Sequence, residues 1–105
     1  MILLERILEA ETKQIIVREI LEALPERFDV VEEREEYISC SAEQICLAAK
    51  NDGQAVGFIC LQETGKETVS LAVMGVLDEF RKDGVGKELF DFAKEIAREK
   101  GFKFA

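Results

Sequence analysis

Apolar residues recur with a helical period in two parts of the chain. From about Glu9 to Leu24 they lie three and four positions apart, which is typical of an amphipathic helix. Pro25, the only proline, predicts the end of that helix. A second helical stripe begins at Gly84 and continues toward Gly101, a natural residue for a helix C-terminus. Residues 32–39, rich in charge and free of glycine, predict a short helix between them.

Three apolar segments predict strands, at residues 44–50, 54–63 and 68–76. Asp52-Gly53 predicts a tight hairpin between the first two. Because the segments are apolar nearly throughout, we expect helices on both faces of the sheet. Residues 2–7 open either a strand or the helix that follows, and residues 102–105 begin a further strand.

Length and composition restrict the class of protein. A chain of 105 residues predicts one domain, and an apolar fraction of 48% is ordinary for a globular protein. No apolar run has the length of a membrane span, and the N-terminus lacks a signal-peptide layout, so we expect a cytoplasmic protein without membrane contact. A net charge of −8 argues against nucleic acid as a partner.

The residue types that are missing exclude several chemistries. The chain has no histidine, which excludes Ser-His-Asp and Cys-His nucleophilic systems and zinc sites that contain histidine; we expect no metal. Cys46 and Cys60 lie inside apolar runs and are expected to be structural. The acidic segment 26–36 has two interpretations: a solvated helix face, or a patch that attracts a cationic amine.

The segment "RKDGVG", residues 81–86, has the character of a phosphate-binding loop between a strand and a helix. Free N–H groups and the helix dipole favour an anion there, and glycines allow it to approach closely. A Walker A loop does not fit, because Arg81 replaces its first glycine and Glu88 its hydroxyl residue. A dinucleotide-binding loop does not fit either, because Leu89 stands at its third glycine.

At this point the chain resembles the GCN5-related N-acetyltransferase (GNAT) family, whose "V-x-P-x-x-R-x-x-G-x-G" segment is similar to "VLDEFRKDGVG" from Val76 to Gly86. Asp78 stands where proline is common. The order of predicted elements is also similar over essentially the whole chain, residues 1–105. The resemblance implies an α+β acyl-CoA N-acyltransferase fold, with a central, mostly antiparallel sheet and helices on both faces.

The resemblance also implies a site for acetyl-CoA. Backbone N–H groups from Asp83 to Lys87 would hold the pyrophosphate of coenzyme A, with charge from Arg81 and Lys87. Backbone groups of Met74 and Val76 would pair with the pantetheine, and the Val76 N–H would serve as oxyanion donor. Gly75 is either the position of a β-bulge that opens the strand or a close-packing position. The full implied set of cofactor-binding residues is Met74, Gly75, Val76, Arg81, Lys82, Asp83, Gly84, Val85, Gly86 and Lys87.

The implied reaction is direct attack of an amine on the thioester, with a small-molecule amine or a protein amino group as acceptor. Glu63, Glu67 and Glu79 are available as general base, and nothing in the sequence selects one. Family members continue with a further helix and strands that this chain lacks, so we expect a C-terminally truncated domain that covers its apolar strand edge, most simply as a homodimer. The alternative function is a catalytically incomplete CoA-binding or assembly module.

Overall fold

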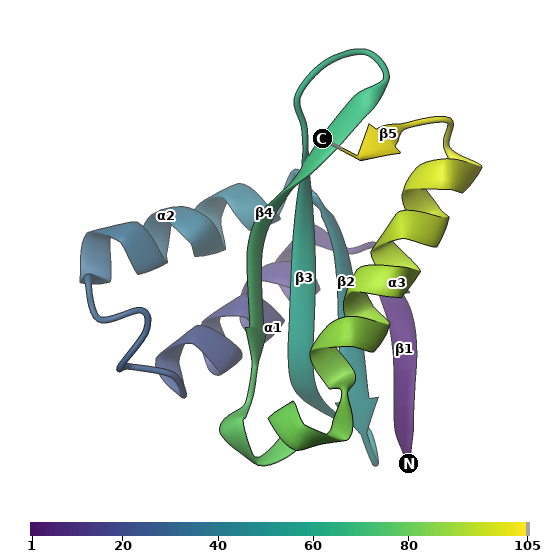
Figure 1. The fold of residues 1–105 in the computed structure, drawn as a ribbon. Helices are drawn as coiled ribbons and strands as arrows, with labels where there is room; N and C mark the ends of the chain where they lie inside the picture. Colours follow the sequence, from purple (N-terminus) through teal and green to yellow (C-terminus); the bar gives the residue numbers. More distant parts are fainter. Residues whose placement is uncertain (105) are drawn as a thin grey trace.

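The computed structural model describes residues 1–104 and places three helices and a 3-10 turn around one sheet (Figure 1). In chain order the elements are β1 (Ile2–Ile7), α1 (Ala10–Glu22), α2 (Val31–Ser41), β2 (Ile45–Asn51), β3 (Gln54–Glu63), β4 (Thr68–Val76), the 3-10 turn η1 (Asp78–Asp83), α3 (Val85–Glu99) and β5 (Lys103–Phe104). The predicted helices and strands are confirmed, with ends that agree to within two residues; residue 105, the end of the last predicted strand, lies outside the described residues. Residues 2–7, which the sequence left open, form a strand.

The five strands lie in the order β1-β2-β3-β4-β5. The first four pair antiparallel, and β5 pairs parallel with the beginning of β4, where Thr68 and Val69 lie opposite Lys103 and Phe104. The sheet is therefore mostly antiparallel, as expected. Beyond Val69 the outer edge of β4 has no neighbouring strand within residues 1–104.

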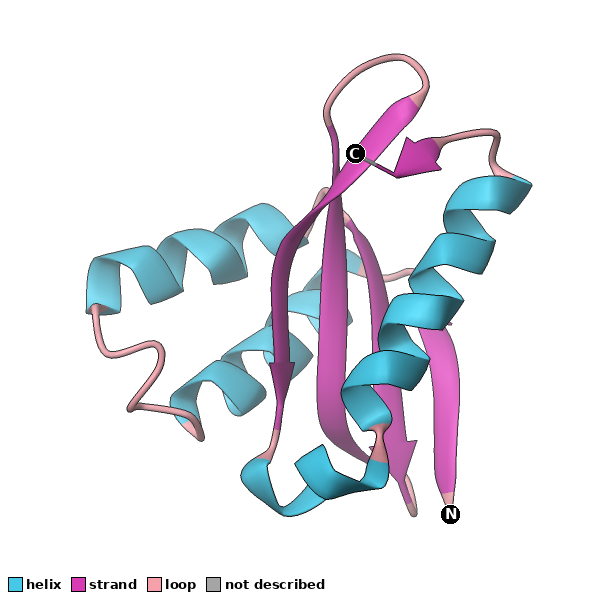
Figure 2. Ribbon diagram, viewed as in Figure 1, coloured by secondary structure: helices cyan, strands magenta, loops and turns pink. Residues whose placement is uncertain are grey.

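Helices cover both faces of the sheet, which confirms the prediction from the apolar strands (Figures 1 and 2). On one face α1 and α2 pack through Ile16, Val17, Ile20, Leu21 and Ile38. On the other face α3 packs through Val85, Leu89, Ala93 and Ala97. Successive side chains of a strand point to opposite faces of the sheet, so β2 and β3 contribute side chains to both cores. Both strands are therefore apolar at successive positions. None of the helices in this part of the chain is long and apolar enough to cross a membrane.

Local turn chemistry accounts for two of the connections. Asp52 and Gly53 have φ values of 52° and 86°, which is the pair of positive φ angles that a type I′ hairpin turn needs. Gly84 has a φ of 74° and is the N-cap of α3, so the chain reverses at this glycine between η1 and the helix. The 3-10 turn itself was not predicted, because its six residues show no clear period.

The β-bulge in β4 does not lie at Gly75. Cys60 faces Val73 and Leu61 faces Leu71, so Ala72 is the extra residue and Gly75 pairs regularly with Phe58. An ideal Cβ on Gly75 would lie 3.1 Å from both Ile20 Cγ2 and Phe58 Cε1. Gly75 is therefore the close-packing position of the two that the sequence allowed, because α1 passes directly over it.

Candidate active site

The glycine segment forms the junction between η1 and α3. Lys82 and Asp83 end the 3-10 turn, Gly84 is the N-cap, and Val85 opens the helix. The Glu88 N–H donates to Gly84 C=O at 3.0 Å and so begins the helical hydrogen bonds. The preceding N–H groups of the first turn have no acceptor within a helix, and no side chain caps them. The junction therefore presents backbone donors and the positive end of the helix dipole.

A cavity of about 350 Å³ lies beside this first turn, between it and the end of β4. It is lined by Arg27, Met74, Gly75, Val76, Arg81 and Gly86. Five of these six residues belong to the set that the sequence predicted. Two arginines and a helix N-terminus around one cavity favour an anionic ligand, because arginine stays charged and donates in a planar fork.

Gly86 lines this cavity without a side chain. An ideal Cβ on Gly86 would lie 3.0 Å from Met74 Cε and 3.8 Å from Val76 Cγ2. At Gly84 a Cβ would meet nothing within 4 Å, and the constraint there is the positive φ. The two glycines thus serve different purposes: Gly84 permits the reversal of the chain, and Gly86 leaves room for the side chain of Met74 against the first turn of α3.

The backbone groups of Met74 and Val76 point toward the open edge of β4. The Leu77 N–H donates to Val56 C=O at 2.9 Å, so this residue pair is hydrogen-bonded. In an antiparallel ladder the neighbouring pairs alternate. Val76 opposite Gly57 and Met74 opposite Ile59 are then the pairs whose N–H and C=O groups face away from β3. An extended ligand at this edge can pair with them as an added strand would.

The other predicted residues do not line the cavity with their side chains. Val85 is fully buried in the core, and Lys87 extends along α3 to Asp91, at 3.3 Å between Nζ and Oδ2. Arg81, which does line the cavity, is held there by Asp78, with 3.3 Å between Nε and Oδ1.

The carboxylates considered as general base, Glu63, Glu67 and Glu79, are all exposed, and none of them lines this cavity.

Arg27 is the residue that sequence reasoning missed. It lies between α1 and α2, where the sequence shows only a mixed-charge segment after Pro25. The Phe28 N–H and the Arg27 N–H both donate to Leu24 C=O, at 3.2 and 3.1 Å, so a tight turn at the end of α1 fixes its position. No local signal marks it, because it reaches the cavity only through the packing of α1 on β4.

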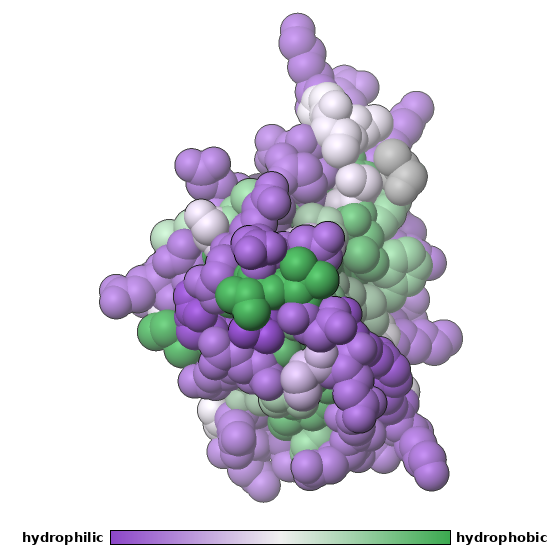
Figure 3. Space-filling view, turned by 90° about the vertical axis from the view of Figure 1, so that its left-hand side faces the viewer, coloured by the Kyte–Doolittle hydropathy of each residue, from purple (hydrophilic) through white to green (hydrophobic). Residues whose placement is uncertain are grey.

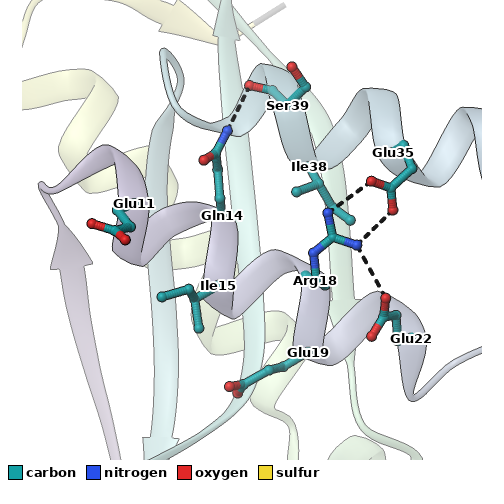
Figure 4. A pocket seen from close by; sticks show the side chains of 9 residues that line it. All are labelled: Glu11, Gln14, Ile15, Arg18, Glu19, Glu22, Glu35, Ile38 and Ser39. Carbon is teal, nitrogen blue, oxygen red and sulfur yellow. Dashed lines mark hydrogen bonds and ion pairs between the residues drawn. The ribbon is translucent and has the colours of Figure 1, made fainter.

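A larger cavity of about 460 Å³ lies between α1 and α2 (Figure 4). Its lining comes from these two helices alone. Arg18 occupies it and donates to both carboxylate oxygens of Glu35, at 2.7 and 2.8 Å, and to Glu22 at 3.3 Å. These hydrogen bonds hold the pKa of Glu35 below its ordinary value. The cation is already neutralised, so this cavity lacks the free donors of the glycine junction.

The family model for acetyltransferases of the GNAT family matches residues 13–105. The chain therefore belongs to the GNAT acetyltransferase family. The family match confirms the family and the α+β fold that the sequence predicted. The cofactor of this family, acetyl-CoA, is also the one that the sequence predicted.

Solved structures of acetyltransferases have the same fold. An IAA acetyltransferase from Bacillus cereus ATCC 14579 is 25% identical, with a TM-score of 0.74 over 97% of this chain and 61% of that one. An aminoglycoside 6'-N-acetyltransferase complexed with coenzyme A is 19% identical, with a TM-score of 0.74 over 95% and 57%. A ribosomal-protein-alanine N-acetyltransferase from Brucella melitensis biovar Abortus 2308 is 18% identical, with a TM-score of 0.70 over 99% and 77%.

The chain thus spans about three fifths of the length of the first of these structures, and 57% of the enzyme complexed with coenzyme A. A search of curated protein sequences found no match to this chain.

Proposed function

We propose that this chain binds acetyl-CoA at the junction of η1 and α3 and transfers the acetyl group to an amine. The observation that carries the proposal is the cavity beside Gly86, where free first-turn N–H groups, Arg27 and Arg81 surround a space into which Gly86 projects no side chain. These donors suit a pyrophosphate, which is the most highly charged part of coenzyme A near its pantetheine arm.

The roles of the residues follow from their positions. The free N–H groups of residues 85–87 in the first turn of α3 bind the pyrophosphate, with Arg27 and Arg81 adding charge. Backbone groups of Met74 and Val76 at the free edge of β4 align the pantetheine. Acetyl-CoA, when bound, supplies a thioester that an amine can attack. The Val76 N–H faces the open edge and donates to the oxyanion that develops on the thioester carbonyl.

The acceptor is an amine, either of a small molecule or of a protein. The solved relatives include an aminoglycoside 6'-N-acetyltransferase and a ribosomal-protein-alanine N-acetyltransferase, so both kinds of acceptor occur on this fold. The net charge of −8 favours a cationic acceptor, because an acidic surface raises the local concentration of cations.

We also propose that the protein is cytoplasmic and forms a homodimer. The outer edge of β4 beyond Val69 has no strand beside it within residues 1–104, and Leu71 on this strand is 41% exposed. A second copy can cover this edge around Leu71 and leave Met74 and Val76 free for the pantetheine, whereas an uncovered edge favours nonspecific association. Light scattering coupled to size-exclusion chromatography tests this, and a monomer at high concentration contradicts it.

Calorimetric titration with acetyl-CoA and with CoA tests the cofactor site. Heat of binding is expected for the unchanged protein and not for a Gly84→Glu, Gly86→Glu double variant, in which two carboxylates face the anion. Lys66→Glu is the matched control, because it changes the net charge equally and lies in the β3–β4 loop, at the other end of the sheet from Gly84 (Figure 1). Equal binding by the double variant would disprove the site.

Transfer is measured by chromatographic separation of acetyl-CoA from CoA over a panel of amines. Thiol reagents are unsuitable, because Cys40 is an exposed free thiol. Binding of CoA without transfer to any amine would favour the binding-module alternative over the enzyme.

A further inference from the structure

Two buried thiols face each other in the core between the sheet and the helices α1 and α2. Cys46 on β2 is paired directly with Cys60 on β3, and their sulfur atoms are 2.9 Å apart. Both are free thiols, and neither lines the cavity beside the first turn of α3. Figure 3 shows the side of the molecule on which α1 and α2 lie, where polar side chains surround a group of apolar ones. The thiols lie in the apolar core beneath these helices.

The geometry of this pair suits a disulfide. Residues directly opposite each other in an antiparallel ladder have Cα atoms about 4.5–5.5 Å apart, which is inside the range of about 4.4–6.8 Å that disulfides span. Both side chains already point toward each other. From 2.9 Å the two sulfur atoms need to approach by less than ~1 Å to reach the length of a disulfide bond. The bond can therefore form through small adjustments of the two side chains.

The hydrogen bonds give the two sulfur atoms different roles. Cys46 Sγ donates to Ser41 C=O at 3.5 Å, so the hydrogen atom between the two sulfur atoms comes from Cys60. This hydrogen bond lowers the pKa of the Cys46 thiol, and the positive charge of Lys13 acts in the same direction. Cys46 is also the less buried of the two, at 3% exposed against 0% for Cys60. Because the thiolate is the nucleophilic form of cysteine, Cys46 is the sulfur that reacts first.

Burial restricts the oxidant that can reach the pair. Thiol–disulfide exchange requires access for a whole attacking or attacked disulfide, which side chains exposed by 3% and 0% do not offer. Hydrogen peroxide is little larger than water and can enter through small local openings of the fold. Cys40, in contrast, is exposed and open to larger thiol reagents. The buried pair is therefore expected to respond to peroxide and not to glutathione disulfide.

We propose that Cys46 and Cys60 are a redox-sensitive modification site, at which hydrogen peroxide forms a reversible disulfide in the folded protein. The Cys46 thiolate attacks one peroxide oxygen, the O–O bond breaks, and the other oxygen leaves as water with the thiol proton; Cys46 becomes a sulfenic acid. The Cys60 sulfur then attacks the Cys46 sulfur, the S–O bond breaks, and the hydroxyl leaves as water with the Cys60 proton. Two thiols thus lose two electrons to one peroxide. This inference does not rest on the proposed acetyl transfer.

The disulfide joins β2 to β3 beside the bulge of β4. Cys60 lies opposite Val73, and the bulged Ala72 is the next residue along that strand. The bond closes a loop of about 15 residues, from 46 to 60, and such a loop restricts the unfolded chain more than the folded one. Oxidation should therefore raise the Tm, by about 5 °C or more. Disulfides that form in a reducing compartment are usually transient and respond to oxidants, which agrees with the proposed cytoplasmic location.

Peptide mapping tests the proposal. The Cys40→Ser variant, which lacks the exposed thiol, is treated with hydrogen peroxide while folded, and the remaining thiols are alkylated in denaturant. Trypsin cuts after Lys50, between the two cysteines, so a disulfide leaves residues 35–50 joined to residues 51–66. Dithiothreitol should separate the two peptides. If Cys40→Ser folds poorly, the unchanged protein with Cys40 alkylated beforehand in the folded state gives the same measurement.

The controls separate this disulfide from general oxidation. A Cys40→Ser, Cys46→Ala double variant lacks the attacking sulfur, and its Cys60 should stay a thiol at the same peroxide concentration. Glutathione disulfide should give no joined peptides; joined peptides from it would overturn peroxide as the specific oxidant.

Three results would overturn the site itself. The first is that both buried thiols stay free under a peroxide exposure that converts the exposed Cys40 of the unchanged protein completely. The second is sulfinic acid at Cys46 without joined peptides, and the third is a lower Tm after oxidation. Acetyl-CoA binding should be the same before and after oxidation, because neither cysteine lines the cavity beside α3. Loss of acetyl-CoA binding by the reduced protein would overturn the proposed function and not the disulfide.

Discussion

Gly86 in the first turn of α3 and Met74 near the end of β4 are in contact because position 86 has no side chain: an ideal Cβ there would lie 3.0 Å from Met74 Cε. The neighbouring atom is the end of a flexible side chain, which can move. Both residues line the cavity beside the first turn of α3, the proposed cofactor site. Steric room at position 86 is therefore expected to affect binding at the proposed cofactor site more than folding.

Gly86→Ala should leave the protein folded and weaken acetyl-CoA. Alanine in a helix gains about 0.5–1 kcal/mol over glycine, which offsets the displacement of Met74, so the free energy of unfolding should stay within about 1 kcal/mol. The added methyl and the displaced Met74 reduce the cavity, and acetyl-CoA should bind about tenfold more weakly. Calorimetry and urea unfolding measure the two effects. Glu95→Ala, on the exposed side of α3, should change neither by as much.

Gly75→Ala, in contrast, should mainly lower the free energy of unfolding. The new Cβ would lie 3.1 Å from Ile20 Cγ2 and Phe58 Cε1, inside a packed core where α1 and β3 cannot move apart freely. Overpacking of this kind costs about 1–3 kcal/mol. Urea unfolding followed by circular dichroism measures the loss. A change below about 0.5 kcal/mol would contradict the close-packing role of Gly75.

Substitutions at Gly84 should follow backbone preference rather than side-chain size. The φ of 74° is in the left-handed region, and no atom lies within 4 Å of an ideal Cβ. Gly84→Ala should cost about 1 kcal/mol, Gly84→Asn less and Gly84→Val more, because asparagine tolerates this region and β-branched residues do not. Thermal unfolding of the three variants gives the order. Equal losses would show that φ is not the constraint.

The buried Cys60 thiol should make stability fall at alkaline pH. Cys46 and Cys60 lie opposite each other on β2 and β3, with 2.9 Å between their sulfur atoms. The hydrogen bond with Cys46, together with burial, raises the pKa of the Cys60 thiol. A raised pKa in the folded state stabilises the fold below the unfolded value of about 8.5, and this stability is lost as the pH rises above it.

With a reductant present, the free energy of unfolding should therefore decrease by about 1.4 kcal/mol per pH unit above pH ~9, for one proton released only on unfolding. Cys60→Ala should remove this slope, whereas Cys40→Ser, which changes an exposed thiol, should retain it. A flat profile in the unchanged protein would show that Cys60 ionises normally in the folded state.

The amino-acid sequence alone determined the order of the elements and the position of the glycine junction. Both depend on local signals: the three- and four-residue spacing from Ile16 to Leu24, the Asp52-Gly53 pair, and two glycines after a strand. Such signals act through backbone sterics and short-range periodicity, so they can be read without the rest of the chain. The resemblance to the family rests on the same segment.

The tertiary structure decided what those local signals could not. The bulge lies at Ala72 and Gly75 is packed under α1, because the register between β3 and β4 follows from side chains on both strands. Arg27 reaches the cavity at the end of β4 through contacts between segments far apart in sequence. A local pattern carries no information about such partners, since they come together only when the two cores on either side of the sheet form.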